Sequence, residues 1–117
     1  MARRLTLLDD DEFAAVCARI DAGSTDRGDL RAATKHTLAL LQRKAPGTSV
    51  EVRVPPFAAA QVIEGQHHTR GNPPAVVETD PQTWIALARG RMSWVDAKVK
   101  ASGERSDLSA LLPLTDV

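Results

Sequence analysis

Two adjacent histidines, His67 and His68, are the residues whose type and spacing come closest to a metal or acid–base site. They lie in a stretch from 64 to 74 that contains glycines and prolines and shows no apolar periodicity, which predicts an exposed loop. Neighbouring loop histidines rarely bind one ion well, and zinc normally needs about three or four protein ligands. A third ligand would have to come from Glu64, Glu78 or His36. We therefore predict no metal site.

The same loop carries Arg70, whose planar guanidinium suits a carboxylate or a phosphate, followed by Gly71, which permits close backbone approach. This pattern predicts capture of an anionic head group. The alternative is a solvated loop in which Arg70 pairs with Glu64 or Glu78, and the sequence leaves both interpretations open.

Covalent catalysis has little support in the chain. The single cysteine, Cys17, shares an apolar helical stripe with Phe13, Val16 and Ile20, and a thiol in apolar surroundings is inert. The chain contains no serine nucleophile elbow, no zinc-protease pair and no glycine-rich phosphate loop. We expect a protein that is not an enzyme and uses no cofactor. An enzyme or accessory domain that uses the two loop histidines and Arg70 is the rival.

The composition of the chain limits the kinds of partner that we expect it to bind. Fifteen basic residues balance fifteen acidic ones, and the aromatic residues make up 3% of 117, so neither a basic footprint nor a base-stacking platform supports nucleic-acid binding. No apolar run approaches the roughly eighteen residues of a membrane-spanning helix. A single cysteine and no secretion signal favour the reducing cytoplasm.

The elements that must position these residues follow from periodicity. Helical spacing predicts helices over 10–22, from a cap at Asp29 to 44, over 81–89 after a cap at Asp80, and two short turns from Ser93 and Asp107. Alternation predicts a strand over 50–54, which lies near a sheet edge or bends at Pro55-Pro56, and a strand over 98–102. The run 57–63 reads as a strand buried on both faces, and 75–78 as a short strand.

This order predicts an α+β fold, in which helices pack on one face of a small mixed sheet of four to five strands. The length fits one domain over residues 1–117, with residues 1–8 as a loosely ordered N-terminus.

Several blocks after residue 49 resemble the bacterial branch of the sterol carrier protein family, as found in actinobacterial proteins. The blocks are 50–56, 68–71 with 73–74, 76–81, 83–84, 87–88, 90, 93–94, 96–97 and 101–113. The general family signature matches at Asp80, Trp84, Gly90 and Ser102-Gly103. The resemblance implies an apolar cavity between sheet and helices that carries a sterol, fatty acid or acyl lipid without transforming it.

On this reading the ligand-binding residues line the mouth of that cavity. They are Phe57, Ile63, His67, His68, Arg70, Trp94, Leu111 and Leu112. Trp84 is expected in the core, whereas Trp94 suits core and pocket equally. A large dry void would cost about as much as the whole domain's stability, so the cavity is either occupied or collapsed. A collapsed cavity would leave a protein-interaction or dimerisation module, and a homodimer is retained as that alternative.

Overall fold

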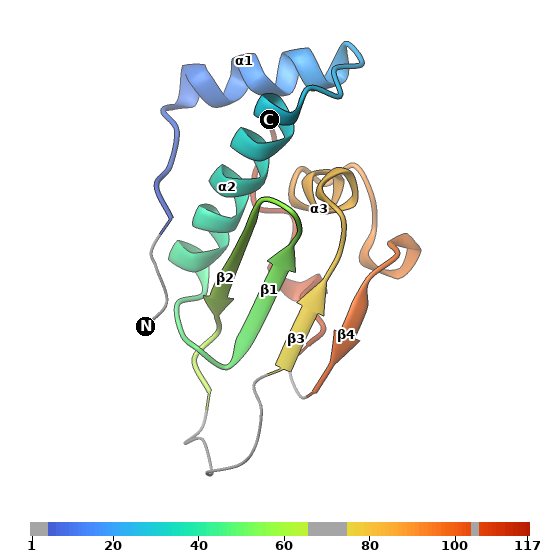
Figure 1. Cartoon of the computed structure of the whole chain (residues 1–117). Helices are drawn as coiled ribbons and strands as arrows, with labels where there is room; N and C mark the ends of the chain where they lie inside the picture. Colours follow the sequence, from blue (N-terminus) through green and yellow to red (C-terminus); the bar gives the residue numbers. More distant parts are fainter. Residues whose placement is uncertain (1–4, 66–74, 104–105) are drawn as a thin grey trace.

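The computed structural model describes residues 5–65, 75–103 and 106–117, and it contains helices and strands in segregated order (Figure 1). The elements are α1 (Asp10–Asp21), α2 (Arg27–Lys44), β1 (Val50–Val54), β2 (Ala58–Val62), β3 (Ala75–Glu78), α3 (Pro81–Ala88), the single 3₁₀ turn η1 (Trp94–Asp96), β4 (Lys100–Ser102) and the single turn η2 (Ser109–Leu111).

The four strands form one mixed sheet in the order β2-β1-β3-β4. β1 runs parallel to β3, and the other neighbours are antiparallel. Alternate residues of β1 face opposite ways: Val50, Val52 and Val54 are buried, whereas Arg53 is exposed. The buried face packs against α2 and α3, so the predicted α+β fold with helices on one face is confirmed.

One of the two alternatives for the first strand is confirmed, and the prediction of a second strand buried on both faces is wrong. The chain bends at Pro55-Pro56, where the turn to β2 begins, but β1 is an interior strand rather than an edge strand. The chain after β2 returns to the other side of β1 and pairs there as β3. Pro55-Pro56 lies beyond the last ladder pair, Val54 with Ala58, so the missing N–H groups cost no sheet hydrogen bond. β2 is one of the two edge strands, and its burial alternates because only one of its faces is covered.

The start of α2 also differs from expectation. Asp26, not Asp29, caps the helix, and its carboxylate accepts from the backbone N–H of Asp29 at 3.2 Å. The Asp29 side chain instead accepts from Ser24 Oγ at 2.8 Å and from Arg19 Nε at 2.9 Å. These bonds, Ser24 first, lower the pKa of Asp29 and join α2 to the end of α1.

Two buried clusters hold the layers together. In the main cluster Trp84 of α3 is fully buried, as predicted, and its indole Nε1 donates to Thr37 Oγ1 of α2 at 2.9 Å. The smaller cluster joins α1 to α2 through Phe13 and Val16, and it contains Cys17, whose pKa is raised by burial. The apolar stripe predicted around Cys17 thus packs in this cluster, with Ile20 partly buried beside it.

A third link ties α1 to the end of α3. The guanidinium of Arg89 is 4% exposed and donates to both carboxylate oxygens of Asp21 at 2.9 Å. Its Nε also donates to the carbonyl of Val117. Because Arg89 is buried and Asp21 is 47% exposed, the pair lies at the boundary between core and solvent.

The segment before α1 lies along α2. The Leu5 N–H donates to Gln42 Oε1 at 2.9 Å, and the Leu8 N–H donates to His36 Nδ1 at 3.0 Å. Leu5 packs on the main cluster and Leu8 on the smaller one. Residues 5–8 thus have defined contacts with the body of the domain.

Candidate functional site

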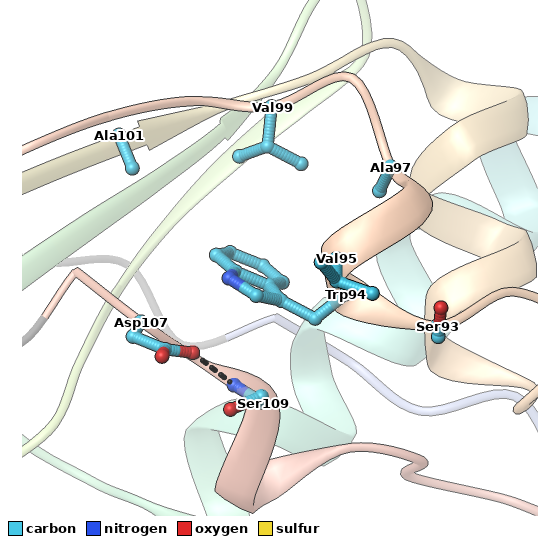
Figure 2. A pocket seen from close by; sticks show the side chains of 8 residues that line it. All are labelled: Ser93, Trp94, Val95, Ala97, Val99, Ala101, Asp107 and Ser109. Atoms are coloured by element: carbon cyan, nitrogen blue, oxygen red, sulfur yellow. Dashed lines mark hydrogen bonds between the residues drawn. The ribbon is translucent and has the colours of Figure 1, made fainter.

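An open hollow of about 630 Å³ lies where the helix layer ends, beside β4 (Figure 2). Ala101 of β4 is in register with the buried Val77 of β3, and residues in register point to the same face. The hollow is therefore a continuation of the core face of the sheet. Its lining is Ser93, Trp94, Val95, Ala97, Val99, Ala101, Asp107 and Ser109.

Local structure fixes the position of Trp94. Gly90, with a φ of 72°, follows the end of α3 in a left-handed conformation that favours glycine. Ser93 Oγ then donates to Asp96 Oδ2 at 2.7 Å across η1. Beyond η1, Thr79 Oγ1 donates to the Lys98 carbonyl at 2.9 Å and holds the approach to β4. The indole ring of Trp94 is consequently presented between β4 and the C-terminal segment.

The C-terminal segment closes the opposite side of the hollow. Leu108 is fully buried in the main cluster and anchors this segment. Asp107 Oδ1 accepts from the Ser109 N–H at 2.9 Å, and this bond lowers the pKa of Asp107. Asp107 is therefore an ionised carboxylate at neutral pH.

A second hollow of about 620 Å³ adjoins the first. It shares Ser93, Trp94 and Ser109 with the first hollow, and Leu112 and Met92 are among its other lining residues. Trp94 is partly buried against the main cluster and lines both spaces. Its side chain is thus placed to control whether one ligand can occupy both.

Comparison with known proteins gives the family. A sequence model of the family described as bacterial SCP ortholog, a sterol-carrier-like family, matches residues 26–114. The chain belongs to this family. The match includes both hollows and all four strands but begins after α1. No curated protein that was compared matches the chain.

The structure of this bacterial SCP-family domain places the predicted ligand residues in different regions. Trp94 lines both hollows and Leu112 the second. Leu111 lies in η2, where its carbonyl accepts from Lys44 Nζ at 2.8 Å. Phe57 lines a separate hollow of about 340 Å³ at the β1–β2 turn, and Arg27 stacks on its ring at 5.3 Å.

The other predicted site residues lie away from Trp94 or outside the described residues. Ile63 follows β2 with a φ of 67° and packs on the main cluster. His67, His68 and Arg70 belong to 66–74, outside the described residues, so their roles stay predictions.

Sequence reasoning missed part of the lining. It predicted a strand over 98–102, but it assigned neither Val99 nor Ala101 of that strand to the site. Asp107 was interpreted only as a helix cap; in the structure it precedes the N-cap residue Leu108, and its carboxylate accepts from the Ser109 N–H. The alternation of residues 97, 99 and 101 was the signal that could have found this wall.

Two further findings bear on ligands and surroundings. Within residues 5–65, 75–103 and 106–117, no three His, Cys, Asp or Glu side chains gather closely enough to hold a metal ion. In the same ranges, no helix has the length and apolar character required to cross a membrane.

Proposed function

We propose that this domain is a non-enzymatic carrier that binds an apolar lipid in the hollow beside Trp94. The observation that carries the proposal is a hollow on the core face of the sheet, walled mainly by Trp94, Val95, Val99 and two alanines. Family membership supports it, because a sterol-carrier-like domain is a lipid-binding domain. Pockets that bind such ligands are mainly apolar with a few placed polar groups.

The first experiment asks whether a lipid is bound at all. Native mass spectrometry of freshly purified protein, followed by lipid extraction, should show a co-purifying apolar molecule. Removing it should lower the melting temperature, since a ligand at 100 times its Kd stabilises the folded state by about 2.7 kcal/mol. For a domain of this size that free energy corresponds to on the order of 10 °C.

The second experiment locates the site. Trp94→Ala should weaken binding of an added long-chain lipid, whereas Phe57→Ala should leave it unchanged because Phe57 lines a different hollow. Equal losses in the two variants would contradict the proposed location. No thermal shift with any fatty acid, alcohol, sterol or acyl-coenzyme A would contradict the carrier function.

One observation favours a second candidate, an interaction or dimerisation module. Val95 is 86% exposed and Met92 37% exposed, and both lie on the rims of the hollows. Exposed apolar side chains that cluster on a surface mark contact sites. Sedimentation of the delipidated protein distinguishes the candidates. An interaction module should form a dimer that Val95→Asp dissociates. A carrier should show the same oligomeric state in the wild type and in Val95→Asp.

A further inference from the structure

We propose that the hollow beside Trp94 selects an uncharged lipid with a hydroxyl head group, which donates a hydrogen bond to Asp107 and accepts one from the Trp94 indole N–H. This inference rests on the proposed carrier function and narrows its ligand class. It differs from the expectation that Arg70 captures an anionic head group.

Charge is the first argument. Among the described residues that line the hollow, Asp107 is the only one with a charged side chain. Lys100 of β4 points to the opposite face of the sheet, because it alternates with Ala101 and is in register with Glu78. An anionic head group would therefore meet a carboxylate, and no cation, among the described residues of this lining. An uncharged head group avoids that repulsion.

The adjoining hollow has one charged side chain of each sign in its described lining. Its charged lining residues are Arg91 and Asp96. The Arg91 guanidinium lies 3.9 Å from Asp21 on α1, whose carboxylate already binds Arg89 at 2.9 Å. Asp96 accepts from Ser93 at the border between the hollows and adds a second negative charge there. The charge argument for a neutral ligand therefore rests on Asp107, in the hollow beside β4.

Hydrogen-bonding capacity is the second argument. A carboxylate has about four acceptor sites, and the Ser109 N–H occupies one of those on Asp107. The indole N–H of Trp94 has no hydrogen-bond partner among the described residues, and in Figure 2 its nitrogen lies on the side of the ring towards Asp107. A hydroxyl both donates and accepts, so it can satisfy Asp107 and Trp94 together. A carboxylate or an ester carbonyl can only accept.

The test compares three ligands with the same hydrocarbon chain: a long-chain alcohol, the fatty acid and its methyl ester. Their Kd values are measured at pH 7.5 on delipidated protein. The alcohol should bind about fourfold more tightly than the acid, the effect of two like charges about 5 Å apart in water. The methyl ester should bind more weakly than the alcohol, because it cannot donate to Asp107.

The decisive variant is Asp107→Asn, which keeps an acceptor for Ser109 and removes the charge. It should tighten binding of the acid until the alcohol-to-acid ratio approaches one, and it should leave the ester unchanged. Asp96→Asn is the matched control, since Asp96 lines the adjoining hollow. It should change the ratio less than Asp107→Asn does.

The outcomes separate this inference from the carrier function. If the wild-type protein binds the acid as tightly as the alcohol, or Asp107→Asn leaves the ratio unchanged, the inference is overturned while the carrier stands. If none of the three ligands binds, the carrier function and the inference fail together. The wild-type comparison decides even if Asp107→Asn does not fold.

Discussion

The same substitution, threonine to valine, should have different effects on the free energy of unfolding at two positions of α2. Thr34 and Thr37 are both fully buried and lie one helical turn apart. Thr37 Oγ1 donates to the Ala33 carbonyl at 2.7 Å and accepts from Trp84 Nε1 at 2.9 Å. Thr34 Oγ1 has no hydrogen-bond partner among the residues that the structure describes. Replacing each with valine keeps shape and β-branching, so the hydroxyl alone is tested.

The expected change in folding free energy depends on whether each substitution leaves a buried polar group without a hydrogen-bond partner. Thr37→Val strands the buried indole N–H of Trp84, and an unsatisfied buried donor costs about 1–3 kcal/mol of folding free energy. Thr34→Val removes a polar group that is already unsatisfied, so it should be neutral or slightly stabilising. Helix propensity hardly differs between threonine and valine. The two variants should therefore differ by about 2 kcal/mol.

Urea denaturation at constant pH measures both variants, since a domain of this size is expected to unfold in one step. A cycle with Trp84→Phe isolates the bond: Thr37→Val should cost about 1 kcal/mol less in the Trp84→Phe background, where no N–H is left to strand. Equal costs for the two valine variants, or an additive cycle, would refute the claim that this bond fixes α3 on α2.

Three other predictions concern pH and ligand length. Burial lowers the pKa of His36 against a smaller opposing effect of Asp10, so protonation favours the unfolded chain. The urea midpoint should fall as pH drops below about 6.5, and His36→Gln should flatten that slope. The Arg89 hydrogen bond lowers the pKa of Asp21, so stability from this pair is present above the unfolded pKa and lost as pH falls through the folded one. Asp21→Asn should flatten the stability profile below pH ~4, and an unchanged profile would count against the pair. Trp94→Ala should join the two hollows and shift the preferred ligand to a longer chain, which a series of alcohols of increasing length would detect.

Sequence patterns predicted helices and strands correctly where a single local cause, such as side-chain alternation or helix capping, determines the structure. The alternation of Val50, Val52 and Val54 with charged residues predicted β1 because a half-buried strand must bury every second side chain. Asp80 was predicted to cap α3, and its carboxylate accepts from the Thr83 N–H at 3.0 Å. Both signals are complete within a few neighbouring residues.

Strand order was not predictable in the same way. Whether β1 is an edge depends on β3, which is separated from β1 by 20 residues and pairs with it in parallel. Pro55-Pro56 indicated an edge or a bend because proline lacks an N–H, and the structure has the bend: the pair lies in the turn, where no ladder bond is needed. The start of α2 was ambiguous because Asp26 and Asp29 are both good caps, and contacts with Ser24 and Arg19 occupy the second.

The candidate site was predicted in part, for a related reason. Trp94 was identified because a tryptophan on a short turn suits a pocket wall, but its companions are defined by where the helix layer stops. Asp107 carries the same local signal whether it only caps Ser109 or also faces a hollow. Phe57 was grouped with Trp94 as an apolar mouth residue, whereas the structure places it beside Arg27 at the β1–β2 turn.

The position of the hollow follows from the small size of the domain. An enclosed dry void of 630 Å³ would cost on the order of 15 kcal/mol at the mutational penalty of about 24 cal/mol per Å³. That equals the upper end of domain stability, about 5–15 kcal/mol, so such a void could not persist in the core. The described structure instead keeps its main cluster packed and opens the hollow at the β4 edge, where single turns replace a covering helix. Water can fill an open hollow, and a lipid that displaces it gains about 25 cal/mol per Å² of apolar surface buried. A site for an apolar ligand is therefore compatible with the stability of this chain at its periphery, and it is at the periphery that Trp94 and Asp107 lie.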